Sequence, residues 1–278
     1  MSTTTLNRTP FYDFHVEQGA KMVEFAGWAM PILYRSIIDE HRQVRASGGV
    51  FDVSHMGRLR VHGPDAQRFL DRICTRRILG MAVGQCRYAL VLNEQGGCRD
   101  DTVICRVGDQ EYLLVCNAAN RSKLLDHFEK VRGDLGFDLR DQTIESGMLA
   151  VQGPKVIDLL AGLVPELAGL KRYRLVVKDL LGARIIIART GYTGEDGVEV
   201  IMPASLAERA IELILSDVGA ADAPVKPAGL GARDTLRMEA AMPLYGHEIT
   251  EDIDPVSAGL AFAVKLDKGE GEDEAGRF

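Results

Sequence analysis

Short runs of alternating apolar and polar residues fill the middle of the chain, with the period of two that β-strands require. This pattern predicts three consecutive strands: Arg87–Asn93, Arg99–Val107 and Glu111–Asn117. The connections, Asn93–Gly97 and Gly108–Gln110, are short. Because short connections join only antiparallel neighbours, the three strands form a meander. A helix is predicted next, over Ala119–Arg132, from apolar residues at helical spacing.

A second set of apolar runs follows and predicts four more strands: Met148–Gln152, Arg174–Asp179, Arg184–Thr190 and Val198–Met202. A helix is expected after them. Ser205 and Glu208 have the spacing of a capping box, in which the two side chains bond free N–H groups at a helix start.

One segment of the chain echoes another. Val61–Leu70 and Val151–Leu160 each predict a strand, a Gly-Pro turn and an amphipathic helix. Two related αβ lobes would explain the echo, and so would the common use of Gly-Pro ahead of helices. Strands closely followed by helices, with hairpins in place of long crossovers, predict the α+β class with mainly antiparallel sheets.

Composition narrows the possible functions. The chain has 278 residues, 46% of them hydrophobic, and a formal net charge of −7. An acidic balance argues against general binding to nucleic acid, and no apolar run has the length of a membrane span. The five cysteines have no CxxC spacing, so a metal site is not expected, and their odd number fits a cytoplasmic location. The sequence has neither a dinucleotide-binding fingerprint nor a P-loop, so a nucleotide cofactor is not expected.

The last residues differ in character from the rest. Residues 267–278 are acidic and rich in glycine, which is typical of a solvated linker. We expect them to be a linker, or the start of a further domain that this chain lacks.

Two acidic residues stand inside predicted strands. Asp100 and Asp101 point to opposite faces of one strand, so one of them faces an apolar side and needs a donor or ligand there. A solvated turn acid is the alternative. Glu199 lies in an apolar strand after the glycine-rich stretch Arg189–Gly197, where backbone can approach a ligand closely. The alternative there is a hairpin turn with an exposed Glu.

Two basic residues follow a glycine-rich helix start. Arg233 and Arg237 are four residues apart and share a helix face, where they can hold a carboxylate or pair with local acids. The six histidines have no ligand spacing, and we interpret them, like the single Trp28, as structural.

Seven segments together resemble the glycine cleavage system T-protein family, in order and spacing, from about Thr9 to Lys265. They are Phe25–Trp28, Phe51–Gly57, Asn93–Asp101, Asn117–Asn120, Arg189–Glu199, Gly229–Asp234 and Leu244–Gly246. The resemblance implies an aminomethyltransferase that moves the methylene carbon of an aminomethyl-lipoyl carrier to tetrahydrofolate. Ammonia is released and 5,10-methylenetetrahydrofolate is formed. It implies a folate-binding region over 8–266, in two interleaved lobes of about 56–145 and about 1–55 plus 146–262. A C-terminal β-barrel-like domain would be missing.

The resemblance also assigns residues. Asp101 matches the family's key acid and is expected to be catalytic. Glu199 matches the acid that grips the pterin edge of tetrahydrofolate, and the folate site would also be lined by Met56, Asn117, Tyr192, Arg233 and Tyr173. Cys105 and Met242 stand where some members have tyrosine, so neither is assigned as a contact. The implied partners are the lipoyl-carrying H-protein and the other glycine cleavage components.

Two other functions are compatible with a resemblance to this family. A folate-dependent demethylase-type module usually accompanies a flavin domain, and the sequence has no dinucleotide fingerprint. A non-catalytic folate-binding relative carries a Lys-Gly-Cys-x-x-Gly-Gln-type signature, which this sequence lacks.

Overall fold

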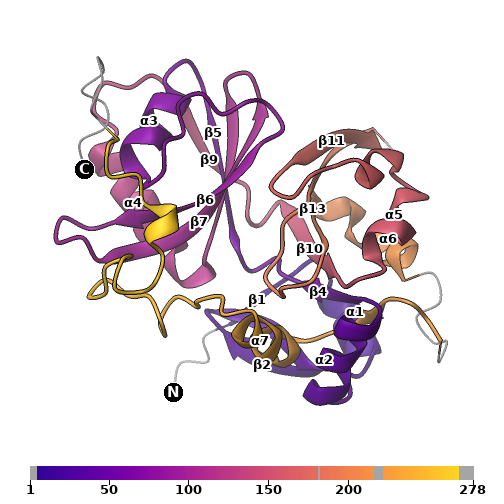
Figure 1. Cartoon of the computed structure of the whole chain (residues 1–278). Helices are drawn as coiled ribbons and strands as arrows, with labels where there is room; N and C mark the ends of the chain where they lie inside the picture. Colours follow the sequence, from indigo (N-terminus) through magenta and orange to yellow (C-terminus); the bar gives the residue numbers. More distant parts are fainter. Residues whose placement is uncertain (1–4, 181, 216–221, 269–278) are drawn as a thin grey trace. The chain divides into compact units, whose positions relative to one another are not determined.

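The computed structural model describes residues 5–180, 182–215 and 222–268, and its chain divides into two compact units (Figure 1). The first unit combines Met1–His55 with Thr143–Met242, and the second combines Met56–Gln142 with Pro243–Phe278. Each unit is therefore built from two separate stretches of the chain. Most of the predicted acidic linker, 267–278, lies outside the described residues.

The first unit contains two sheets. The smaller has the order β1-β3-β2 and the larger the order β11-β12-β13-β10-β4-β14. Among the strand pairs that the structure describes in this unit, only β1–β3 and β4–β14 are parallel. The strands are β1 (Asn7–Arg8), β2 (Lys21–Phe25), β3 (Trp28–Leu33), β4 (Gly49–Asp52), β10 (Ser146–Gln152), β11 (Leu175–Leu180), β12 (Ala183–Ala188), β13 (Gly197–Pro203) and β14 (Lys226–Pro227).

The helices of the first unit are mostly short. They are α1 (Tyr12–Glu17), α2 (Ile37–Ala46), α5 (Val156–Ala161), α6 (Ala207–Ile214) and α7 (Leu230–Glu239), with 3-10 turns η2 (Pro165–Ala168) and η3 (Ala204–Leu206). Apolar residues of β10, β13, α5 and α6 form the core against the larger sheet. Helix α2 begins at Ser36, whose side chain accepts a hydrogen bond from Asp39 N.

The second unit has one antiparallel sheet, β6-β7-β8-β5-β9. Its elements are β5 (Gly57–His62), α3 (Ala66–Ile73), β6 (Cys86–Leu92), β7 (Cys98–Gly108), β8 (Glu111–Cys116), η1 (Ala118–Asn120), α4 (Arg121–Val131), β9 (Asp138–Asp141) and η4 (Ala261–Ala263). The core includes Phe69, which stacks on Phe137 and meets Phe128 edge-on, both favoured aromatic geometries.

The predicted meander and helix are confirmed. Strands β6, β7 and β8 lie within one residue of the expected bounds at each end, and α4 follows them. The predicted α+β class with mainly antiparallel sheets is also confirmed. No helix in the described part of the chain is both long enough and apolar enough to cross a membrane.

The capping box was wrong. Ser205 lies inside the 3-10 turn η3, and α6 begins only at Ala207, without a side-chain hydrogen bond at its cap. Ala204 N donates to Glu145 O at 2.9 Å, which holds this turn onto the sheet. A tertiary backbone hydrogen bond, and not a local side-chain cap, therefore sets where this helical segment begins.

The two echoing segments make the same backbone turn. Gly63 has φ 142° and Gly153 has φ 145°, and each glycine carbonyl accepts a 3.1 Å bond from the amide three residues later. A Cβ at Gly63 would lie 2.8 Å from Phe137 Cα, and one at Gly153 would lie 2.4 Å from Ser47 O. Both positions therefore require glycine, for backbone conformation and for space.

Residues 243–262 differ from the expected division. They belong to the second unit, although the sequence placed them with the first. Asn93 Nδ2 donates to Glu251 O at 2.9 Å, and Cys98 N donates to Thr250 O at 2.9 Å. Ile249 also packs in one apolar cluster with Cys98, so both hydrogen bonds and apolar side chains hold this segment onto the β6–β7 hairpin.

Candidate functional site

An acid pair, one of its members buried, occupies the start of β7 in the second unit. Asp100 is fully buried and accepts three N–H groups: Asn117 N at 3.0 Å, Asn117 Nδ2 at 2.8 Å and Asn120 Nδ2 at 2.6 Å. The solvated-turn alternative is therefore wrong for Asp100. The asparagines come from the end of β8 and the turn after it, which the β7–β8 pairing brings beside Asp100.

Asp101 is half-buried and shares a donor with Asp100. Asn117 Nδ2 donates to Asp101 Oδ1 at 2.7 Å, and Tyr88 Oη donates to Asp101 Oδ2 at 3.2 Å. Burial raises the pKa of Asp101, and these two hydrogen bonds oppose the rise. A carboxyl held by neutral donors, with a pKa shifted toward neutrality, suits proton transfer at ordinary pH.

The titration of Asp100 leads to a stability prediction. Burial, and next the charge of Asp101, raise the pKa of Asp100 from 3.8 to about 8. The folded chain therefore holds this proton more tightly than the unfolded chain, and the associated stability is lost as pH rises from about 4 through about 8. We expect the Tm of the wild type to fall over this range by several degrees more than that of Asp100→Asn, measured by thermal denaturation.

A matched control for this prediction is Asp254→Asn. Asp254 is exposed, and hydrogen bonds from Ser257 lower the pKa of its carboxyl, so its stability contribution changes only in acid. Its curve of Tm against pH should run parallel to that of the wild type above about pH 5. Parallel curves for Asp100→Asn and the wild type would contradict the shifted titration.

Met56, also in the second unit, lies in the turn before β5. Its carbonyl oxygen accepts a 2.6 Å bond from Nη1 of the fully buried Arg58. This contact fixes the backbone of Met56. Its assignment to a folate site stays a prediction.

The first unit holds a second cluster, on the segment Arg189–Glu199. The fully buried Gln152 donates through Nε2 to Thr190 O at 3.1 Å and accepts from Thr193 Oγ1 at 3.1 Å. A Cβ at Gly191 would lie 1.8 Å from Gln152 Oε1, so only glycine lets the loop approach this amide. Arg189 and Asp196 close the base of the loop with a two-point ion pair at 3.1 and 2.5 Å.

Three predicted site residues lie on or beside this loop. Glu199, half-buried on β13, accepts a 2.5 Å bond from Thr190 Oγ1. The guanidinium carbon of Arg233, on α7, lies 4.9 Å from the centroid of the Tyr192 ring, within the range of a cation–π contact. Because Glu199 is half-buried and hydrogen-bonded, the alternative of a hairpin turn with an exposed Glu is wrong for this side chain.

Arg233 has unused donor capacity. Its Nη1 is buried and has no hydrogen-bond partner among the described residues. Burial lowers the pKa of Arg233, and the charges of Glu199 and Tyr192 oppose that change. A buried guanidinium N–H without a partner carries a desolvation cost that an acceptor on a ligand would relieve.

The remaining residues singled out in the sequence lie in different environments. Arg237 binds Asp234 at 2.8 Å, so the alternative of pairing with a local acid holds for it. Tyr173 is 48% exposed, with a left-handed backbone at φ 57° and its N–H donating to Arg189 O. Tyr173 thus lies beside the loop's base. Trp28 is buried, as its structural interpretation requires, and the five cysteines are buried as free thiols.

Sequence reasoning missed three residues of these clusters: Tyr88, Asn120 and Gln152. Each contributes through a partner far away in the sequence. Only Asn120 had a signal, since it closes the Asn117–Asn120 segment beside the predicted strand. Within the described residues, no group of three or more His, Cys, Asp or Glu side chains could hold a metal ion.

The fold and its two clusters define a two-unit α+β protein with a hydrogen-bonded carboxylate pair in one unit and an Arg–Tyr–Glu cluster in the other. The model of the GCVT N-terminal domain matches residues 11–268, and the chain belongs to this aminomethyltransferase family.

Named relatives agree with this. The chain is 48% identical over 271 residues to an aminomethyltransferase of Rubrobacter xylanophilus, covering 96% of this chain and 70% of the relative. It is 44% identical to the enzyme of Desulforamulus reducens, covering 95% and 72%. Among solved structures, the glycine cleavage system aminomethyltransferase T of Bartonella henselae is similar with a TM-score of 0.84, 35% identity, and coverage of 95% and 70%.

Proposed function

We propose that this chain transfers the methylene carbon of an aminomethyl-lipoyl H-protein to tetrahydrofolate, giving 5,10-methylenetetrahydrofolate. Ammonia leaves when the C–N bond of the arm breaks, and the carrier leaves as its dihydrolipoyl thiol when the C–S bond breaks. The observation that carries the proposal is the hydrogen-bonded acid pair Asp100–Asp101 in a chain of the aminomethyltransferase family. The other glycine cleavage components are the expected partners, and a cytoplasmic location stays a prediction.

The residues of the first unit suit recognition of the pterin. A carboxylate such as Glu199 accepts two parallel N–H groups, and the pterin edge offers two. The buried Nη1 of Arg233 needs an acceptor, which a carbonyl of the ligand would supply. Tyr192 adds an aromatic face next to it. The donor and acceptor chemistry of this cluster therefore fits tetrahydrofolate.

Asp101 is assigned the chemical role. Loss of ammonia from the S–CH2–NH3⁺ arm develops positive charge at carbon, and a carboxylate with little access to water stabilises that charge well. The folate amine must also lose a proton as it attacks, which a carboxylate of raised pKa can accept. Asn117 fixes the carboxylate from one side. The expectation that Asp101 and Glu199 face one pterin-sized cavity stays a prediction.

An assay of product formation tests the function. The chain is incubated with aminomethyl-lipoyl H-protein and tetrahydrofolate, and 5,10-methylenetetrahydrofolate and ammonia are measured. The aminomethyltransferase of Rubrobacter xylanophilus, 48% identical, is the positive control. Equal amounts of both products are expected. Tetrahydrofolate binding without either product would favour a non-catalytic folate-binding protein.

A further inference from the structure

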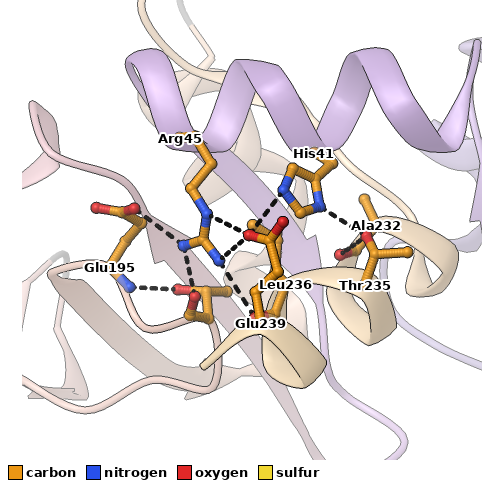
Figure 2. Close-up of polar contacts among 8 residues, drawn as sticks. His41, Arg45, Glu195, Ala232, Thr235, Leu236 and Glu239 are labelled. Atoms are coloured by element: carbon orange, nitrogen blue, oxygen red, sulfur yellow. Dashed lines mark hydrogen bonds and ion pairs between the residues drawn. The ribbon is translucent and has the colours of Figure 1, made fainter. Parts of the chain in front are cut away.

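One arginine of the first unit uses every donor that it has. Arg45 lies in the last turn of α2, and its guanidinium makes five hydrogen bonds (Figure 2). Nη1 donates to Thr193 O at 2.7 Å and to Glu195 Oε1 at 2.9 Å. Nη2 donates to Leu236 O at 3.2 Å and to Glu239 Oε2 at 2.9 Å, while Nε donates to Glu239 Oε2 at 3.1 Å. Arginine has five N–H donors, so none is left over.

These partners belong to two different segments. Thr193 and Glu195 follow Tyr192 in the glycine-rich loop, and Leu236 and Glu239 lie one and two turns after Arg233 on α7. Figure 2 shows Arg45 with Glu195 on one side and Glu239 on the other. We propose that Arg45 is a positioning residue for the folate site. It sets the loop that carries Tyr192 against the helix that carries Arg233.

The rest of the arrangement supports this role. His41, one turn before Arg45 on α2, also contacts Glu239, at 3.2 Å, and bonds Thr235 at 2.8 Å. Gly194 has φ 81°, and a Cβ there would lie 2.9 Å from Ala240 Cβ and 3.7 Å from Arg45 Nη1. The loop therefore runs close against the end of α7, next to the arginine. Gln152 and Arg45 both hold the same loop, since Gln152 bonds Thr193 through its hydroxyl and Arg45 bonds it through its carbonyl.

The exposure of these groups argues for positioning more than for stability. The side chains of Arg45, Glu195 and Glu239 are 27%, 24% and 58% exposed. Ion pairs of this exposure contribute little to folding free energy. A planar guanidinium with five fixed donors, however, sets the geometry of the groups around it in a way that lysine cannot. The loop, and not the global fold, should therefore respond to its removal.

Hydrogen exchange and ligand binding test the inference on the purified chain. In Arg45→Ala, amides of the 190–197 loop should exchange at least about ten-fold faster than in the wild type, with a Tm change of only a few degrees. The Kd for tetrahydrofolate should rise about ten-fold. Arg45→Lys should give loop exchange rates and a Kd between those of the wild type and those of Arg45→Ala. If Arg45→Ala does not fold, Arg45→Lys is the variant that tests the inference. Glu195→Gln, which keeps an acceptor oxygen, should weaken binding less than Arg45→Ala.

Arg60→Ala is the matched control. Arg60 pairs with Glu111 at 2.8 Å, with side-chain exposures of 28% and 16%, but on β5 of the second unit. It should leave loop exchange and folate Kd unchanged. Only the folate-binding part of this test rests on the proposed function; the hydrogen-exchange part does not. Unchanged loop exchange in Arg45→Ala would overturn it, and so would faster exchange without weaker binding in a chain whose wild type binds folate. A wild type that binds no tetrahydrofolate would instead refute the proposed function.

Discussion

Replacing Asp101 by Asn should lower kcat by about 10²–10³-fold while tetrahydrofolate still binds with nearly its original affinity. The change keeps the size of the side chain and one oxygen that can accept from Asn117 Nδ2. It removes the negative charge that would stabilise the developing cation, and the base that would take the amine proton. Steady-state kinetics, with folate binding measured separately by calorimetry, checks both halves of this prediction.

Asp126→Asn provides the control for that experiment. Asp126 is an exposed acid on α4 of the same unit, so the substitution removes the same charge outside the hydrogen bonds that hold the acid pair. Its kcat should equal that of the wild type. If Asp101→Asn lost folate binding but kept its turnover per bound complex, the catalytic role would be wrong and Asp101 would be a recognition residue.

The sequence predicted the β6–β7–β8 meander because short polar connections leave few topologies open. It grouped residues 243–262 with the first unit, whereas they cluster with the second, because their contacts join residues far apart in the sequence. Asn93 donates to Glu251 O, and Ile249 packs in one apolar cluster with Leu90 and Cys98. The capping box at Ser205 failed for a similar reason, since a backbone bond between Ala204 and Glu145 overrides the local preference.

The candidate site was predictable where burial conflicts with charge. Asp100 and Asp101 stood out because acids in an apolar strand need partners, and the structure supplies Asn117 and Asn120. Arg45 could not be found in this way, because arginine near the end of a helix is ordinary. Its partners Thr193 and Glu239 are 148 and 194 residues away in sequence. Only folding brings them together.

The opposite result is expected for Glu199, in the cluster of the first unit. Glu199→Gln should raise the Kd for tetrahydrofolate about 100-fold, or about 2.7 kcal/mol, while kcat at saturating folate changes by less than about three-fold. The amide keeps one acceptor but replaces the other with an N–H group, which would face a donor of the pterin edge. Its carbonyl oxygen can still accept from Thr190 Oγ1, so the loop should stay in place. Calorimetry and saturation kinetics measure the two effects.

Glu166→Gln is the control for this experiment, because it changes another glutamate of the first unit. Glu166 pairs with Lys178 at 2.5 Å in the η2 region and is 48% exposed, so its loss should leave folate affinity unaltered. A Glu199→Gln enzyme with normal Kd and a large loss of kcat would reverse the assigned roles of the two carboxylates. Recognition by Glu199 and chemistry by Asp101 therefore stand on separate measurements, since the two substitutions should move different constants.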